Sequence, residues 1–311
     1  MNVKACAEYL KKNDNFLIVS HKNPDGDTMG SCAALCSALR RIGKNAFLYP
    51  NAQVIKKLVP YVEKFYAPNE FVPAVGVAVD VATDKMFAQG FDGKVQLCID
   101  HHPTNSRYAK KLLLKPKKAS CGEIILELIK ALCGELTKEE ADLLYIAVST
   151  DTGCFMYANT SAATLKAAAK LYEYGASAAM LNQIFFRKKS AARLKLEGMI
   201  FSGMNFYRDG KICVVKITKD MLMKAGATND DLDDIAGLAG MAEKSLVNVT
   251  IRELDDGSSK VSLRSGKEVN SSEICAVFGG GGHNMAAGCT ISCLPDKAEN
   301  MILDVINEVW K

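Results

Sequence analysis

The sequence predicts an α/β fold in two domains, and three observations support this class. The chain has 311 residues, 49% of them hydrophobic, which favours two domains with well-buried cores. In the first half, short apolar runs alternate with helical patterns, as in a parallel sheet covered by helices. Beyond about residue 200 the pattern becomes rich in strands, which predicts a smaller α+β domain. We therefore expect a first domain over residues 1–187, a linker over 188–199 and a second domain over 200–311.

Apolar runs in the first domain predict the strands of its sheet. They are nearly continuous in apolar residues, as expected where both faces of a parallel sheet are covered. The three runs are Phe16–Val19, Val75–Val79 and Val95–Ile99, with a shorter strand expected at Asn45–Tyr49. Polar residues with catalytic or metal-binding capacity follow each of the three. Because the carboxyl ends of parallel strands meet at one edge, we expect these residues to converge there.

Helical spacing predicts the elements that cover this sheet and complete the second domain. Four helices are expected in the first domain: Gly30–Ile42, Cys121–Leu132, Thr137–Ser149 and Thr160–Tyr174. We interpret the basic segment Phe185–Lys195 as a connector rather than a phosphate-binding wall. The second domain is expected to contain the strands Lys211–Ile217, Leu246–Leu254, Lys260–Arg264 and Gly288–Cys293, and the helices Asn270–Phe278 and Asp296–Trp310. Asn270 and Glu273 form a capping pair at the start of the first of these helices.

Charge and cysteine content limit the function classes. The formal net charge of +4 suits a compact anionic ligand better than a long duplex. With no signal-peptide pattern and no apolar run of membrane-spanning length, we expect a cytoplasmic protein without membrane partners. The eleven cysteines include no C-x-x-C pair, and we interpret them as reduced, buried thiols.

The segment from His21 to Asp27 has the composition of a metal site. Its sequence, His-Lys-Asn-Pro-Asp-Gly-Asp, places one imidazole and the carboxylates of Asp25 and Asp27 within seven residues. We expect these residues on a tight loop held by Pro24 and Gly26. Imidazole combined with carboxylate oxygens suits Mn²⁺, Mg²⁺ or Fe²⁺. The alternative is a turn whose carboxylates are only structural.

Three more acidic segments follow apolar runs. They are Asp80, the triplet Asp100-His101-His102, and Asp151 within Val148–Gly153. Asp80 alone could instead cap a helix. Clustered carboxylates repel one another, so together they require cations between them. We therefore predict two divalent cations, typically about 3.5–4 Å apart, which activate water for phosphoester hydrolysis. His102, beside a ligating histidine, is a candidate donor to the phosphoryl or leaving oxygen.

In order, these four motifs resemble those of the DHH phosphoesterase superfamily. The segment Gly279–Gly288 is similar to the glycine-rich signature of the DHH-associated C-terminal domain. The resemblance implies that one metal is held by His21, Asp25 and Asp80, and the other by Asp27, Asp80, His101 and Asp151. Asp80 would bridge the two. His102 would face the scissile phosphate, and Asp100 would be a supporting or weakly ligating carboxylate.

The glycine tract predicts an anion-binding site in the second domain. Gly280, Gly281 and Gly282 allow close approach of backbone N–H groups to an anion, and His283 adds a donor. A flexible turn is the alternative. The resemblance adds Arg264 and Ser265 as contacts to a terminal phosphate. It also implies an active site in a cleft between the two domains.

The length and domain pairing are most similar to the nanoRNase and pAp phosphatase group of this superfamily. This resemblance implies a metal-dependent hydrolase of short single-stranded oligonucleotides, dinucleotides and 3′-phosphoadenosine 5′-phosphate (pAp), with Mn²⁺ as the expected ion. Alternatives are an inorganic pyrophosphatase or polyphosphatase, a cyclic or linear dinucleotide phosphodiesterase, and a non-catalytic nucleotide-binding module. Met86 and Met156 stand where relatives often carry basic residues, which leaves substrate preference open. Homodimer formation is likewise left open.

Overall fold

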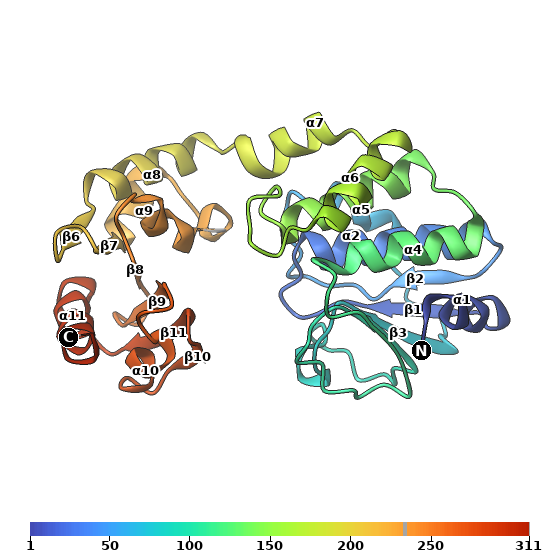
Figure 1. Ribbon diagram of the computed structural model, residues 1–311, viewed down its shortest axis with the longest axis horizontal. Coiled ribbons are helices and arrows are strands. Elements are labelled where there is room, and N and C mark those ends of the chain that lie inside the picture. The colour runs from blue at the N-terminus through green and yellow to red at the C-terminus, as the bar shows by residue number, and fades with distance from the viewer. Residues whose placement is uncertain (233–234, 311) are drawn as a thin grey trace. The chain divides into compact units, whose positions relative to one another are not determined.

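The computed structural model describes residues 1–232 and 235–310. The chain divides into two compact units, Met1–Lys188 and Lys189–Lys311 (Figure 1). Each unit has its own sheet and its own apolar core. The predicted fold class is confirmed, since a parallel α/β unit is followed by a unit built on a mixed sheet. Among the residues described, none of the helices has the length and apolar character needed to cross a membrane.

The first sheet has five parallel strands in the order β2-β1-β3-β4-β5. Their bounds are β1 (Phe16–Val19), β2 (Ala46–Leu48), β3 (Val75–Val79), β4 (Leu97–Asp100) and β5 (Lys111–Leu114). All residues of β1, β3 and β4 are buried, which explains their continuous apolar sequences. The edge strand β5 was not predicted, because only one of its four residues is buried. The chain leaves β1 toward β2 and later returns to β3 on the other side. Ligands bind beside such switch points in open α/β sheets.

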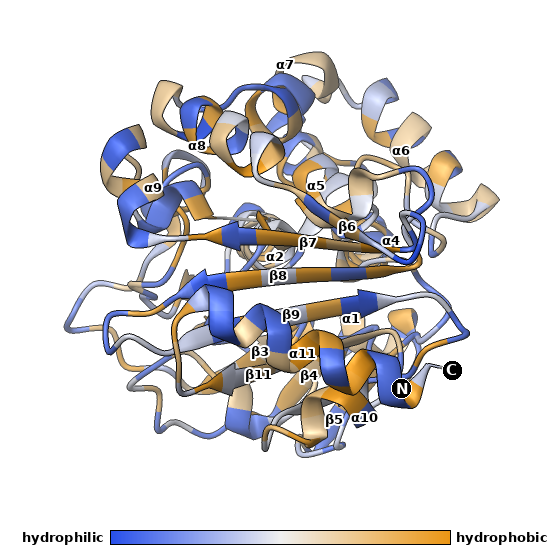
Figure 2. Ribbon diagram, turned by 90° about the vertical axis from the view of Figure 1, so that its left-hand side faces the viewer, coloured by the Kyte–Doolittle hydropathy of each residue, from blue (hydrophilic) through white to orange (hydrophobic). Residues whose placement is uncertain are grey.

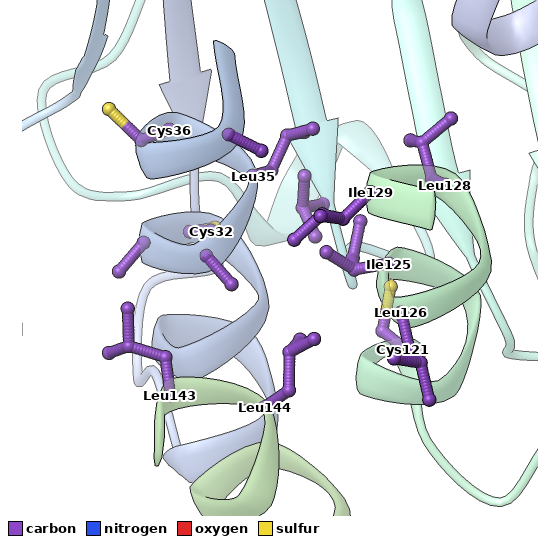
Figure 3. Packing of buried hydrophobic residues seen from close by; sticks show 14 of the residues in the cluster. Cys32, Leu35, Cys36, Cys121, Ile125, Leu126, Leu128, Ile129, Leu143 and Leu144 are labelled. Carbon is purple, nitrogen blue, oxygen red and sulfur yellow. The ribbon is translucent and has the colours of Figure 1, made fainter. Parts of the chain in front are cut away.

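Helices α2 (Gly26–Arg41) and α4 (Cys121–Cys133) pack on this sheet, and α5 (Lys138–Asp151) packs against both of them. Figure 3 shows Leu35 of α2 facing Ile125 and Ile129 of α4 across their shared interface. The unit also contains α1 (Val3–Lys12), α3 (Val59–Val62), α6 (Ala162–Glu173), α7 (Ala178–Asn182) and the short turns η1 (Glu63–Phe65) and η2 (Asp84–Met86). Close packing of α2 against α5 requires Gly30, because a Cβ atom there would overlap the carbonyl oxygen of Leu143.

The basic segment between the units is not one regular element. It contains one π-helical turn, η3 (Gln183–Arg187), and then the start of α8 (Ala191–Ser202). The side chains of Lys189 and Arg193 both bind the carboxylate of Glu197, at 2.7 Å and 2.6 Å. These two cations are therefore engaged within the second unit.

The second unit contains a six-stranded sheet in the order β10-β11-β9-β8-β7-β6. The strands are β6 (Asn205–Tyr207), β7 (Ile212–Ile217), β8 (Val247–Glu253), β9 (Ser259–Ser265), β10 (Gly281–His283) and β11 (Ala286–Ile291). Only β7 and β8 run parallel; the other neighbours are antiparallel. β7 is orange along most of its length in Figure 2, as expected for its buried position in the sheet.

Helices cover the faces of this second sheet unequally. α10 (Ser271–Ala276) and α11 (Pro295–Val309) share a core with alternate residues of β8, β9 and β11. On the opposite face, α8, α9 (Lys219–Ala225) and η5 (Ile235–Met241) share a core with residues of β7. η5 also contacts β8, and η4 (Asn229–Leu232) precedes η5. Asn270 caps α10 as predicted, accepting hydrogen bonds from the N–H groups of Ser272 and Glu273. The eleven cysteines are free thiols, also as predicted.

Candidate metal centre and anion-binding edge

The carboxyl edge of the first sheet brings together seven of the predicted residues. Their imidazole nitrogens and carboxylate oxygens form three overlapping groups, in each of which the ligand atoms lie within 4.8 Å of one another. The groups are His21, Asp25 and Asp80; Asp27, His101 and Asp151; and Asp80, His101 and His102. Asp80 and His101 each occur in two groups. This arrangement of hard oxygen and imidazole donors is compatible with divalent metal ions.

The predicted loop extends only from His21 to Asp25, because Asp25 is the N-cap of α2 and Asp27 lies in the first turn of this helix rather than on the loop. The Asp25 carboxylate accepts a hydrogen bond from the Thr28 N–H at 3.0 Å and caps the helix. Because of this cap, α2 begins at Gly26, four residues earlier than its apolar pattern indicated. Asp27 therefore sits in the first helical turn, with its side chain directed into the protein and 1% exposed.

Asp27 is oriented by another helix. Its carboxylate accepts hydrogen bonds from the N–H groups of Cys121 at 2.7 Å and Gly122 at 2.9 Å, the first residues of α4. The Ser31 hydroxyl donates a third, at 3.1 Å. Free N–H groups at a helix N-terminus favour a negative charge, so α4 both positions and stabilises this carboxylate.

Asp80 has the most unusual environment of the cluster. It directly follows β3, is 3% exposed and adopts a left-handed backbone with φ of 61°. Such a conformation is unfavourable for a residue other than glycine and is often found at functional sites. The Thr28 hydroxyl donates to Oδ2 at 2.6 Å, but Oδ1 has no hydrogen-bond partner. Asp80 caps none of the helices described, so the helix-cap role considered as an alternative is not the one it has. A buried carboxylate oxygen without a hydrogen-bond partner is unfavourable unless a cation neutralises it, which fits the predicted role of Asp80 as a metal ligand.

His101 presents one ring nitrogen to the acidic cluster. Its Nδ1 lies 3.2 Å from the carbonyl oxygen of Lys118, which requires a proton on Nδ1 and leaves Nε2 facing the cluster. Nε2 lies 3.4 Å from Asp80 Oδ1, 3.7 Å from Asp151 Oδ2 and 3.8 Å from Asp27 Oδ2. Burial lowers the pKa of His101, but the neighbouring carboxylates outweigh it and raise the pKa to about 10. The cluster therefore attracts positive charge.

Asp100 is the fully buried residue beneath the two histidines. Its Oδ1 accepts from the His102 ring Nδ1 at 2.8 Å and from the His101 N–H at 2.8 Å, and its Oδ2 accepts from Asn105 Nδ2 at 2.6 Å. Burial raises the pKa of Asp100, but hydrogen bonds from His102 and Asn105 outweigh it and hold the pKa below its usual value. Both carboxylate oxygens are thus engaged, consistent with a supporting role.

Asp151 reaches the cluster from the last residue of α5 rather than from a strand end. Burial raises the pKa of this carboxyl to about 6, and the nearby Asp80 and Asp25 add to the effect. Asn159 donates hydrogen bonds to the carbonyl oxygens of Asp151 at 3.0 Å and Ala119 at 3.2 Å. The segment after Asp151 is thereby tied to the segment that orients His101.

Several residues that shape the site were missed by sequence reasoning. They are Thr28, Ser31, Asn105 and the Lys118 carbonyl, which bind the candidate ligands or Asp100. Thr28 and Asn105 lie close in sequence to predicted motifs, so that proximity was the available signal. A backbone carbonyl such as that of Lys118 carries no residue-type signal.

The predicted anion-binding residues lie together on the second sheet. Strand register aligns Arg264 of β9 with Ala286 of β11, and Ala286 with His283 of β10. Paired residues project to the same face, so Arg264 and His283 share the face opposite α10 and α11. Both are exposed. The hydroxyl of Ser265 is instead engaged with Val269 O at 2.6 Å and Ser271 Oγ at 2.7 Å.

The glycine tract forms a strand rather than a flexible turn. β10 pairs with β11 along its whole length. A Cβ atom on Gly282, whose φ is 150°, would lie 2.5 Å from the Ala286 carbonyl oxygen. A Cβ atom on Gly280 would overlap the Gly288 carbonyl oxygen, whereas Gly281 has open space around it. Two of the three glycines are thus required by strand packing.

The fold and the carboxyl-edge cluster define an α/β protein with a site suited to divalent metal ions, and comparison with known proteins agrees. Residues 15–148 match the DHH family, N-terminal domain, and residues 209–311 match the DHHA1 domain. The chain is 35% identical to the bifunctional oligoribonuclease and PAP phosphatase NrnA of Thermus thermophilus, over 98% of this chain and 94% of that protein. The protein of the same name from Bacillus subtilis is 29% identical, with 94% of each chain covered. The chain therefore belongs to the DHH family of phosphoester hydrolases, which confirms the family and the enzyme class predicted from the motifs.

More distant relatives and solved structures extend this comparison. The cyclic-di-AMP phosphodiesterase PdeA of Listeria monocytogenes is 22% identical, over 99% of this chain and 50% of that protein. The crystal structure of an exopolyphosphatase-related protein from Bacteroides fragilis has a TM-score of 0.87 at 22% identity, covering 98% and 95% of the two chains. RecJ from Thermus thermophilus in complex with Mn²⁺ has a TM-score of 0.55 at 13% identity, covering 98% of this chain and 54% of that chain. At these identities, the structural likeness concerns the fold.

Proposed function

We propose that this protein is a two-metal phosphoesterase that hydrolyses short oligoribonucleotides and pAp. The observation that carries the proposal is Asp80 Oδ1, a buried carboxylate oxygen without a hydrogen-bond partner between two groups of candidate ligands. An oxygen in this position suits a bridge between two cations. The near full-length similarity to oligoribonucleases and PAP phosphatases supports the substrate class.

The proposed ligand sets are those that the family motifs imply, and the three groups of neighbouring donors support them. One ion would be held by His21, Asp25 and Asp80, and the other by Asp27, Asp80, His101 and Asp151. When bound, the two cations would lower the pKa of a water molecule and stabilise negative charge on the phosphoryl oxygens. The nitrogen and oxygen donors favour Mn²⁺, with Mg²⁺ or Fe²⁺ as alternatives. Hydrogen bonds already orient both side chains, since N–H groups of α4 donate to Asp27 and the His101 ring donates to the Lys118 carbonyl oxygen. This orientation reduces the conformational entropy that the two side chains would lose when a metal ion binds.

His102 is the proposed contact to the reacting phosphate. Asp100 Oδ1 accepts a hydrogen bond from His102 Nδ1 at 2.8 Å, so Nε2 is the ring atom available for substrate. The hydrogen bond to Asp100 raises the pKa of His102, which favours the protonated, donating form. The protonated ring can then donate to a phosphoryl or leaving oxygen.

Arg264 and His283 are the proposed grip for a substrate phosphate in the second unit. Arg264 offers an exposed guanidinium fork, and His283 lies in the same cross-strand row. Gly281, exposed and without close neighbours, leaves the strand edge accessible to an anion. Because the Ser265 hydroxyl is hydrogen-bonded to Val269 and Ser271, we propose that Ser265 stabilises the loop between β9 and α10 rather than binding phosphate.

A substrate panel tests the proposed function. With Mn²⁺ present, we expect rapid release of mononucleotides from diribonucleotides and of phosphate from pAp. Pyrophosphate and cyclic di-AMP should be poor substrates by comparison. Rapid cleavage of pyrophosphate with no cleavage of pAp or dinucleotides would contradict the proposal. Loss of activity in a chelator and its recovery with added Mn²⁺ would test the metal requirement.

A further inference from the structure

The segment that follows Asp151 has a strained backbone and an exposed apolar tip. Gly153, Cys154 and Phe155 have φ values of 54°, 56° and 67°, so three successive residues are left-handed. Residues other than glycine rarely adopt this conformation, and two in succession are unfavourable unless surrounding contacts impose it. Here the Cys154 N–H donates to the Ser149 carbonyl oxygen at 2.7 Å and closes the turn on α5.

The turn directs one of its large side chains into the protein and two others toward solvent. Phe155 is directed inward and packs on the core of the first unit, with its ring centroid 6.1 Å from that of Tyr145. Met156 and Tyr157 point outward and are 79% and 54% exposed. The strained turn is therefore accompanied by two large side chains that are more than half exposed.

The Tyr157 ring lies against the backbone of the turn that follows Asp151. A Cβ atom on Gly153 would overlap the ring, so glycine allows the ring to lie against the chain two residues after Asp151. The Tyr157 N–H donates to the Thr152 carbonyl oxygen at 3.0 Å. Asn159 ties the same segment to the Asp151 and Ala119 carbonyl oxygens. The ring thus lies against Gly153, two residues after the candidate ligand Asp151, in a segment that hydrogen bonds hold in place.

We propose that Tyr157, flanked by Met156, is a stacking platform for the nucleobase next to the scissile phosphate. This inference rests on the proposed function and adds a base-recognition residue to it. An aromatic face beside a phosphate-binding centre is how proteins hold single-stranded nucleotides without reading their sequence, because every base has a π-face. The platform predicts a preference for nucleotides over pyrophosphate, because pyrophosphate has no base to stack.

Comparison of substrates with and without a base tests the platform. Tyr157→Ala should lower kcat/KM for a diribonucleotide by roughly 10- to 100-fold. It should change kcat/KM by less than about 3-fold for the analogue in which both bases are replaced by hydrogen. Tyr157→Phe should retain the activity of the unsubstituted protein, because stacking does not need the hydroxyl. Tyr172→Ala is the matched control, since that tyrosine is 55% exposed on α6.

Two results would overturn the platform. Equal losses on both substrates would show that Tyr157 only supports the metal site, and no loss on either would show that it has no role. A second readout does not require turnover. Calorimetry on the Mn²⁺-loaded protein should show weaker binding of AMP to Tyr157→Ala, with binding of ribose 5-phosphate unchanged. If the unsubstituted protein cleaved no dinucleotide, the proposed function would fail, while the AMP comparison would still decide the platform.

Discussion

The two candidate ligand-binding regions differ in how firmly their side chains are held. At the carboxyl edge of the first sheet, Asp27, Asp100 and His101 are each positioned by hydrogen bonds to backbone or side chains. On the second sheet, Arg264 and His283 are exposed. Side chains must be held in place before the reaction where charge develops on the reacting phosphate. Side chains that only bind a substrate phosphate can become ordered when the substrate binds. We therefore expect substitutions in the first region to reduce turnover and those in the second to weaken substrate binding.

The largest effect is expected for Asp80→Asn, which preserves side-chain shape and removes the charge. Turnover should fall by roughly 10³-fold or more, because bridging of two cations stabilises the reacting phosphate by several kcal/mol. In chelator, the same variant should unfold at a higher temperature than the unsubstituted protein, because it removes a buried negative charge that repels the neighbouring carboxylates of Asp27 and Asp151. Activity assays and thermal unfolding check the two effects. Unchanged turnover would refute the bridging role.

The next largest effect is expected for Asn105→Ala, which removes the hydrogen bond to Asp100 Oδ2. Turnover should fall by about 10- to 100-fold with little change in KM, since Asp100 would hold His102 less firmly. Asn182→Ala is the matched control, because Asn182 bonds Tyr145 on α5 away from the cluster. A rise in KM alone would place Asn105 in substrate binding instead.

Arg264→Ala tests the second region. We expect KM for pAp to rise by about 10- to 100-fold with kcat within about 3-fold, because one charge-assisted grip on phosphate is lost. Arg264→Lys should give an intermediate KM, since it keeps the charge but not the fork. If kcat fell as much as KM rose, the contrast between the two regions would not hold.

Paired glycine substitutions separate the two possible roles of β10. Gly282→Ala should reduce substrate affinity by about 10-fold, because the Cβ atom would press on the Ala286 carbonyl oxygen and displace β10. Gly281→Ala, where space is open, should leave the strand pairing intact. Equilibrium binding and hydrogen exchange of β11 amides would measure both variants. Equal effects on exchange would show that the packing difference is unimportant.

The smallest effect is expected for Glu299→Gln, which tests stability of the second unit rather than chemistry. Burial raises the pKa of Glu299, but hydrogen bonds from Lys216, Asn205 and Tyr207 outweigh it and lower the pKa. The folded-state pKa is below the unfolded value of about 4.3, so the carboxylate stabilises the fold above that value. This contribution is lost as the pH falls through the folded pKa. We expect the substitution to cost about 1–3 kcal/mol of unfolding free energy at pH 7 and progressively less in acid, measured by denaturant titration. A cost independent of pH would contradict this linkage.

The sequence by itself determined the α/β class, the strands that lead into the site and the types of residue gathered there. Continuous apolar runs ending in Asp or His are conspicuous, because buried carboxylates are unfavourable without partners. Only the tertiary structure decided how these residues are held. The start of α2 at Gly26, the left-handed backbone of Asp80 and the strand at Gly281–His283 depend on local geometry that apolar periodicity does not record. The donors to Asp27 lie 94 and 95 residues away and are backbone N–H groups, which every residue except proline possesses. A sequence can therefore reveal which residues form such a site, but the backbone groups that position them become identifiable only once the chain is folded.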